Sequence, residues 1–208
     1  MKTLAFELSS GQGSLALLED GAVLFERGFP SDRKDSGAFF ENVQLCLEQF
    51  GVPGEIVVGL GPGSYAGVRI AIATALGLRT AVRASLVGIA SICAIDVEDR
   101  DCCVIGDARR QSFYLARVSN GRLVDGPALM SANDLETKIT DVAMPVYSSE
   151  RLLRFPLVKL AYPSARRLAD LAHLQSAEID DNRPLEPIYL RGPHITTPKE
   201  PRVFAPTK

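Results

Sequence analysis

Residues 2–29, "KTLAFELSSGQGSLALLEDGAVLFERGF", predict three consecutive antiparallel strands. The expected strands are "KTLAFEL", "SLALLE" and "AVLFERGF", and they are separated by the turns "SSGQG" and Asp20-Gly21. Asp-Gly between alternating apolar residues is a strong hairpin signal because both turn residues tolerate a positive φ. The chain is therefore expected to open with a three-stranded meander.

The same pattern recurs about one hundred residues later, in "CCVIGDARRQSFYLARVSNGRLVDGPAL" at residues 102–129. A gap-free alignment sets Glu7 on Asp107 and the Asp20-Gly21 turn on Asn120-Gly121. A matching acid after the first strand, together with a matching hairpin turn, indicates two lobes of common ancestry. We predict residues 1–101 as the N-terminal lobe and residues 102–208 as the C-terminal lobe, which ends in an extended proline-rich tail.

Helical and strand patterns follow each meander. The first lobe continues with a helix "SGAFFENVQLCLEQFG", a buried parallel strand "EIVVGL", a helix "AGVRIAIATALGLRTAV" and a strand "LVGI". The second continues with a helix "SANDLETKI", a strand "MPVYSS" and a helix "YPSARRLADLAHLQ", before a tail with a short edge segment at "PIYLR". The order β-β-β-α-β-α, complete once and shortened once, predicts an α/β protein of the actin-like ATPase (ASKHA) fold. Nucleotides in that fold bind between the lobes, so Glu7, Ser10 and Asp107 are expected to face the cleft.

Composition excludes several classes of protein. The chain has 208 residues, of which 46% are hydrophobic and 23% charged, a composition typical of a globular protein. A net charge of −2 gives no excess of cations for binding nucleic acid directly. The first apolar run ends at Glu7, too early for a signal peptide, and no segment approaches the length of a membrane span. These features favour a cytoplasmic protein, in which four cysteines without a CxxC pair pack as small hydrophobic residues.

The glycine-rich stretch "GLGPGSYAGVRI", residues 59–70, matches none of three nucleotide or catalytic motifs. It lacks the Gly-Lys pair of a P-loop, the third glycine of GxGxxG and the flanking glycines of GxSxG. A mechanical role is the alternative. Pro62 fixes φ, while Gly61 and Gly63 permit a sharp turn or a close approach of the backbone. Ser64 is expected to cap the next helix, and Gly67 provides a position without a side chain where another element can pack closely. Backbone N–H groups at this turn leave anion binding open as a second role.

These segments carry a family resemblance. "GLGPGSYAGVRI" resembles the GPGS[FY]xGxR signature of the TsaB (YeaZ) family, which is needed to make threonylcarbamoyladenosine in tRNA. "LAFELSSGQGSLAL", "DARRQSFYLA" and "PIYLR" resemble the opening hairpin, the second-lobe opening and the near-terminal segment of that family. The chain departs from the family in three features: Glu7 replaces the usual Asp, the second lobe is short, and residues 31–37 lack a histidine often found there.

The resemblance implies a non-catalytic partner of the catalytic subunit TsaD, with TsaE as a further ATPase component. Contact with tRNA would then be indirect, and a homodimer is the alternative assembly for the chain alone. TsaD holds a metal through an HxxxH helix, whereas His173 and His194 lack that spacing, so no metal site is expected. No intrinsic cofactor is expected either, and binding of ATP or ADP at the partner interface stays open.

Two enzymatic alternatives remain. The first is a small actin-fold phosphotransferase in which Glu7 and Asp107 surround a magnesium nucleotide. Against it, the turn "SSGQG" lacks the lysine, threonine or arginine that commonly grips phosphates. The second is a glycopeptidase, an activity suggested by an old name for such sequences, but neither metal ligands nor a Ser/His/Asp arrangement can be assembled.

The partner surface is predicted on the two first-lobe helices, at about residues 36–50 and 66–83. The first helix has more large apolar residues than one core face needs, and the second has a stripe of small residues that allows close helix packing. In the family the corresponding helices pair TsaB with its homologue. The alternative is that these residues are simply core. The residues assigned to the interface are Phe39, Phe40, Val43, Arg69, Ala73 and Gly77.

Overall fold

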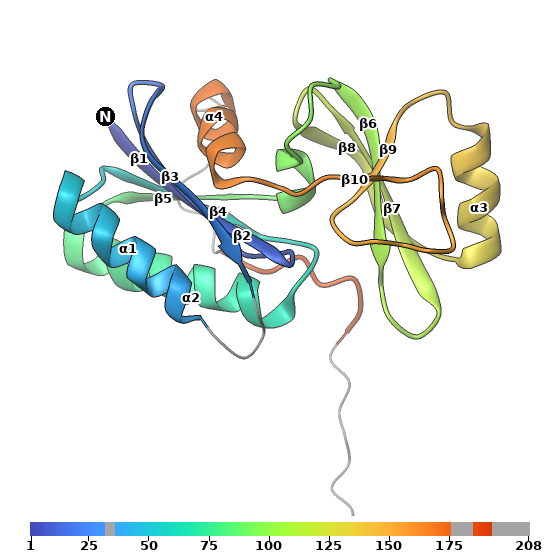
Figure 1. Cartoon of the computed structure of the whole chain (residues 1–208), viewed down its shortest axis with the longest axis horizontal. Coiled ribbons are helices and arrows are strands. Elements are labelled where there is room, and N and C mark those ends of the chain that lie inside the picture. The colour runs from blue at the N-terminus through green and yellow to red at the C-terminus, as the bar shows by residue number, and fades with distance from the viewer. Residues whose placement is uncertain (32–35, 176–184, 193–208) are drawn as a thin grey trace, which may run out of the picture.

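The computed structural model describes residues 1–31, 36–175 and 185–192, which form two lobes with one mixed five-stranded sheet each (Figure 1). The strand orders are β3-β2-β1-β4-β5 and β10-β9-β6-β7-β8. Read from the opposite end, the second order repeats the first, with three antiparallel strands followed by two parallel ones. The structure therefore confirms the internal repeat and the two-lobed α/β architecture.

In the first lobe, helices α1 and α2 cover the same face of the sheet (Figure 1). Gly51 ends α1 with a φ of 77°, as the sequence predicts. The elements of this lobe are β1 Lys2–Glu7, β2 Gln12–Glu19, β3 Ala22–Pro30, α1 Gly37–Phe50, β4 Glu55–Gly59, α2 Tyr65–Val82 and β5 Ser85–Ile89, followed by the 3-10 helix η1 Ser91–Ala94.

The second lobe is a shortened copy of the first. Its helix α3 packs on β7 and β8, and residues 149–158 form turns where the first lobe has α2. "PIYLR" forms no strand, so the predicted edge segment is wrong. The elements are β6 Asp101–Asp107, β7 Ser112–Ser119, β8 Arg122–Ser131, α3 Ala132–Asp141, β9 Val146–Ser148, β10 Lys159–Leu160 and α4 Ala165–Gln175.

Both predicted hairpin turns are confirmed by their backbone conformation. Asp20 and Gly21 have φ values of 50° and 83°, and Asn120 and Gly121 have values of 50° and 71°. Two consecutive residues with positive φ give the turn a twist that matches the twist of the strands it joins. The equivalent turns explain why β2 and β7 lie in equivalent places in the two sheets.

Helix α4 follows the second-lobe strands in sequence but packs against β1, β2 and β4 of the first sheet. It covers the face of that sheet opposite α1 and α2 (Figure 1). The backbone N–H of Ala165, in its first turn, donates to Ser14 Oγ at 2.8 Å. β6 of the second sheet begins at Asp101, one residue before the predicted division at 101/102, and the chain after β10 crosses back to the first sheet.

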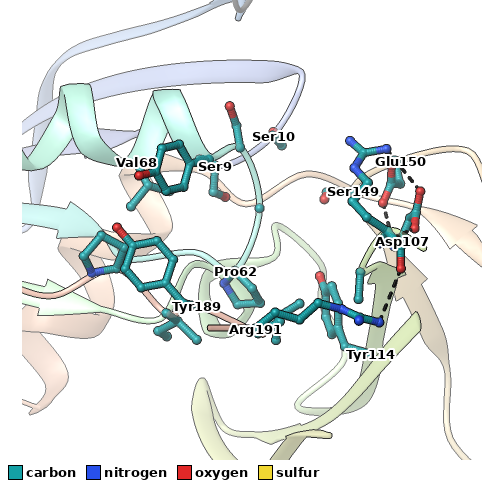
Figure 2. A pocket seen from close by; sticks show the side chains of 18 of the residues that line it. Ser9, Ser10, Pro62, Val68, Asp107, Tyr114, Ser149, Glu150, Tyr189 and Arg191 are labelled. Carbon is teal, nitrogen blue, oxygen red and sulfur yellow. Dashed lines mark hydrogen bonds and ion pairs between the residues drawn. The ribbon is translucent and has the colours of Figure 1, made fainter. Parts of the chain in front are cut away.

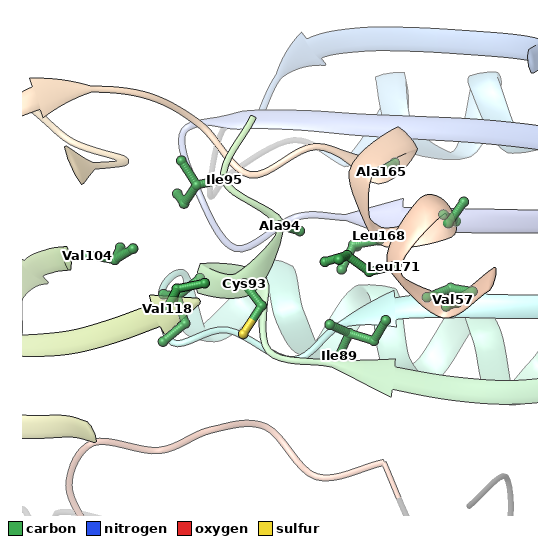
Figure 3. Close-up of a cluster of buried hydrophobic side chains, with 14 of the residues drawn as sticks. Val57, Ile89, Cys93, Ala94, Ile95, Val104, Val118, Ala165, Leu168 and Leu171 are labelled. Atoms are coloured by element: carbon green, nitrogen blue, oxygen red, sulfur yellow. The ribbon is translucent and has the colours of Figure 1, made fainter. Parts of the chain in front are cut away.

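A continuous apolar core joins the two lobes (Figure 3). Val57 and Ile89 reach it from the first sheet, Val104 and Val118 from the second, and Leu168 from α4. Because a large apolar interface resists separation, this packing fixes the orientation of the lobes. All four cysteines are free and buried, as predicted. Burial raises the pKa of Cys93, which lies in this core, to about 12.

The turn before α2 lies directly on the turn between β1 and β2. A Cβ atom added to Gly63 would lie 2.1 Å from the Ser9 carbonyl oxygen, and one added to Gly67 would lie 2.0 Å from the Leu8 carbonyl oxygen. Ser64 N donates to Ser9 O at 2.6 Å, and Ser64 Oγ accepts from Gly67 N at 3.2 Å, which confirms the predicted helix cap. Glycine is required at both positions because backbone occupies the space of a side chain.

Glu7, the last residue of β1, is fully buried beneath these two turns. Its Oε1 accepts from Ser9 N at 2.6 Å, while Oε2 has no hydrogen-bond partner among the residues that the structure describes. A Cβ atom on Gly59 would lie 1.9 Å from Oε2, so only glycine leaves room for this carboxyl group. Burial raises the pKa of Glu7, and the hydrogen-bonding groups of Ser9 and Ser91 lower it by less.

Replacing Gly63 with valine is expected to lower the free energy of unfolding by about 1–3 kcal/mol, because the new side chain meets the Ser9 carbonyl group. Chemical denaturation measures this change. Gly77→Val is the matched control, since a Cβ atom there has no neighbour within 4 Å, and its effect is expected to stay within about 0.5 kcal/mol. Equal effects of the two substitutions would contradict the close-packing account.

Glu7→Gln is expected to stabilise the protein increasingly as the pH rises above 4.5, the ordinary pKa of the carboxyl group. The raised pKa means that the folded state holds the proton more tightly than the unfolded chain. The protonated carboxyl group therefore contributes stability that is complete below pH 4.5 and is lost as the pH rises toward the folded pKa. The loss amounts to at most about 1.4 kcal/mol for each pH unit in that window.

Denaturation of the wild type and the Glu7→Gln variant between pH 4 and pH 8 measures this difference. Two curves that stay parallel over the whole range would show that Glu7 titrates alike in the folded and unfolded states.

Candidate functional site: the interlobe pocket

A pocket of about 430 Å³ lies between the two lobes (Figure 2). Its walls come from four turns: those between β1 and β2, before α2, between β6 and β7, and after β9. Residues 187–192 of the C-terminal segment complete the lining. The repeat places equivalent turns from both lobes on opposite sides of one cavity.

The first-lobe wall consists of the lining residues between Ser9 and Val68, and none of those that the structure describes is charged. Two of its hydroxyl groups are engaged locally. Ser10 Oγ donates to Gln12 O at 2.8 Å and accepts from Gln12 N at 3.2 Å, while Ser64 Oγ caps α2. This wall therefore offers no cationic group for a phosphate.

On the second-lobe wall, Asp107 is held by its own turn. Oδ1 accepts from Arg109 N at 2.6 Å, and Oδ2 pairs with the Arg109 guanidinium group at 3.1 Å. The backbone N–H of Asp107 donates to Glu150 Oε1 at 2.8 Å. Both carboxylate oxygens of Asp107 are thus engaged by Arg109. Because the pair is largely exposed, it contributes little to stability.

The two aligned acids share one structural role. Glu7 and Asp107 each accept a hydrogen bond at 2.6 Å from the backbone N–H two residues further along the chain. They differ in exposure, because Asp107 lines the pocket whereas Glu7 is fully buried and does not. The expectation that both acids face the cleft is therefore wrong for Glu7, whose carboxyl group turns inward against Gly59. Of the predicted cleft residues, the pocket brings together Ser10 and Asp107.

The predicted interface residues divide between the core and the surface. Phe39 is only 2% exposed and Val43 is buried, because that face of α1 packs against the first sheet, with Phe39 edge-on to Phe6. Their assignment to the surface is corrected accordingly. Four of the predicted residues are exposed on the outer faces of α1 and α2, namely Phe40, Arg69, Ala73 and Gly77. Leu45 and Leu76 are also exposed there, at 46% and 45%, and both follow from helical spacing once the buried face is known.

The residues that the structure describes bear on metal binding and on membrane insertion. No group of three histidine, cysteine, aspartate or glutamate residues in this part of the chain lies close enough together to hold a metal ion. His173 is exposed on α4, and His194 lies outside the described residues. Of the helices described, none is both long and apolar enough to span a membrane.

The fold is similar to that of a solved structure, YeaZ from Pseudomonas aeruginosa. The TM-score is 0.72, the match covers 91% of this chain and 99% of that chain, and 23% of the aligned residues are identical. This similarity confirms the predicted fold class.

Two curated relatives are uncharacterized mycobacterial proteins. The chain is 35% identical over 156 residues to one from Mycobacterium leprae, and 32% identical over 139 residues to one from Mycobacterium tuberculosis. These alignments cover 72% and 66% of this chain. They span 42% and 64% of the relatives, so the chain matches only part of their length.

A family model described as TsaD, tRNA N6-adenosine threonylcarbamoyltransferase, matches residues 40–168. The match begins in α1 and extends into α4, so it includes both the turn before α2 and the second-lobe pocket wall. The resemblance noted from the sequence motifs is confirmed at the level of this wider family. The chain therefore belongs to the TsaD family.

Proposed function

We propose that this chain is a non-catalytic subunit that supports a catalytic TsaD-like subunit in forming threonylcarbamoyladenosine next to the tRNA anticodon. Family membership supports a role in this reaction. The interlobe pocket supports the assignment of catalysis to the partner subunit. The observation that carries the proposal is the uncharged first-lobe wall, beneath which Glu7 is buried. A TsaE-like ATPase and the tRNA would reach this chain through the partner in the cytoplasm, with ATP or ADP at the partner interface and none in this pocket.

The pocket geometry disfavours a phosphotransferase. That reaction needs acidic groups exposed toward a magnesium nucleotide. Glu7 is sequestered with a raised pKa, which favours its neutral form, and Asp107 is neutralised by Arg109. The remaining acid on the pocket wall, Glu150, accepts the backbone N–H of Asp107. These groups stabilise turns, which is the role expected of a lobe that supports a partner.

The outer faces of α1 and α2 suit a docking surface. Phe40 and Leu76 expose 48% and 45% of their surface, and a partner that covers them would remove this apolar area from water. Ala73 and Gly77 share the exposed face of α2 with Leu76, and their small size leaves that face open to close approach by another helix. A TsaD-like subunit with a related lobe would present an equivalent helix pair. A homodimer through the same surface is the fallback, because related surfaces can be self-complementary.

Ala73→Glu is expected to abolish association with a TsaD-like subunit, because a desolvated carboxylate would replace a small apolar contact. Co-elution in size-exclusion chromatography measures binding, and reconstituted tRNA modification measures the consequence. Ala143→Glu, at another exposed alanine, in the second lobe, is the control and should retain both. Retention of binding and modification by a folded Ala73→Glu variant would exclude this surface.

The isolated chain is expected to release no phosphate from Mg·ATP above the buffer rate. In a reconstituted system with a TsaD-like subunit and a TsaE-like ATPase, Asp107→Asn should keep activity within about twofold, since asparagine retains the acceptor for Arg109 N. Phosphate release and nucleoside analysis of the tRNA measure these outcomes. Turnover by the chain alone that Asp107→Asn eliminates would favour the phosphotransferase.

A further inference from the structure

Residues 185–192 bridge the two lobes on the pocket side of the molecule. Leu185 packs with the first-lobe core, and Ile188 N donates to Leu60 O at 2.8 Å. Leu190 packs against the core that joins the lobes, and Arg191 Nη2 contacts the Arg109 carbonyl oxygen of the second lobe at 3.5 Å. Tyr189 and Arg191 line the same pocket as Pro62 and Val68 of the first lobe and Tyr114 of the second (Figure 2). This segment therefore contacts both lobes although it belongs to neither sheet.

A stack of three side chains connects this segment to the outside of α2. The rings of Tyr189 and Tyr65 have centroids 5.7 Å apart and planes inclined by 37°. The Arg69 guanidinium carbon lies 4.9 Å from the centroid of the Tyr65 ring, and Arg69 Nη1 also donates to the Tyr65 hydroxyl group. Arg69 holds the Tyr65 ring from one side through a cation–π contact and a hydrogen bond, while Tyr189 packs on the same ring.

We propose that residues 185–192 are a strap that ties the lobes across the pocket, and that Arg69 controls how firmly the strap is held through Tyr65 and Tyr189. The covalent connections between the lobes pass through η1 and through the segment before α4, whereas the strap contacts the pocket-facing turns themselves. Loosening the Tyr65–Tyr189 contact would free the segment that forms one wall of the pocket. The second-lobe turn at Arg109 would then lose its contact with Arg191.

Arg69 is exposed on the α2 face assigned to docking. A partner carboxylate that pairs with Arg69 would withdraw it from Tyr65 and weaken the strap, so docking would change access to the pocket. This consequence rests on the proposed function. The coupling between Arg69 and the strap does not, because it lies within one chain and is tested without a partner.

Amide hydrogen exchange on the full isolated chain tests the coupling, with Arg69→Ala compared with Arg79→Ala. Both arginines are exposed on α2, but only Arg69 contacts Tyr65. Arg69→Ala is expected to raise exchange rates in residues 185–192 by about threefold or more. The control variant should leave these rates unchanged, and exchange in β1 and β4 should be the same in both variants.

A second pair of variants tests the strap itself. Tyr189→Ser should accelerate exchange in residues 185–192 and at the second-lobe turn around Arg109, whereas Tyr189→Phe keeps the ring and should match the wild type. Unchanged exchange at the Arg109 turn in Tyr189→Ser would overturn the strap. Unchanged exchange in residues 185–192 in Arg69→Ala would overturn its control by Arg69. Faster exchange throughout β1 and β4 in Tyr189→Ser or Arg69→Ala would show that the side chain stabilises the whole fold. That result would also contradict the proposal.

Discussion

The close contact between the turn before α2 and the turn after β1 determines the geometry of the interlobe pocket. Gly63 and Gly67 bring the α2 backbone against the carbonyl groups of Ser9 and Leu8, at distances that exclude any side chain. The hydrogen bond from Ser64 N to Ser9 O fixes the position of one turn relative to the other. The glycine-rich motif therefore shapes the site by packing. Its backbone contacts the neighbouring turn, and its serine side chain caps α2.

The same contact explains the different positions of the two aligned acids. With the β1–β2 turn pressed against α2, the longer Glu7 side chain lies beneath it, in space left by Gly59. In the second lobe, residues 149–158 after β9 form turns in place of a helix like α2, and the turn at Asp107 stays partly exposed and pairs with Arg109. Duplicated segments thus keep one local hydrogen bond while they differ in burial and charge. A pocket built from two such turns is therefore asymmetric.

The sequence predicts the features that depend on local patterns. The hairpin turns, the cap at Ser64, the end of α1 at Gly51 and the repeated strand order all follow from neighbouring residues. It does not predict that Phe39 and Val43 face the core. The helix has apolar residues on more than one face, and only the position of the sheet decides which face is buried. Nor does the sequence predict that α4 crosses to the first sheet, or that Tyr189 stacks on Tyr65, since these contacts join residues far apart in the chain. The burial of Glu7 depends on Gly59, a neighbour on the adjacent strand that no motif links to it.

Hydroxyl-radical footprinting of the chain with and without a TsaD-like subunit is the most direct test of docking on α1 and α2, because it reports side-chain exposure on both lobes at once. The second lobe supplies an internal reference in Leu153 and Leu157, which are 95% and 81% exposed. If the subunit docks on α1 and α2, Phe40, Leu45 and Leu76 lose their oxidation when it is added, while Leu153 and Leu157 keep theirs. Protection of Leu153 and Leu157 with continued oxidation of Phe40 and Leu76 would contradict docking on α1 and α2.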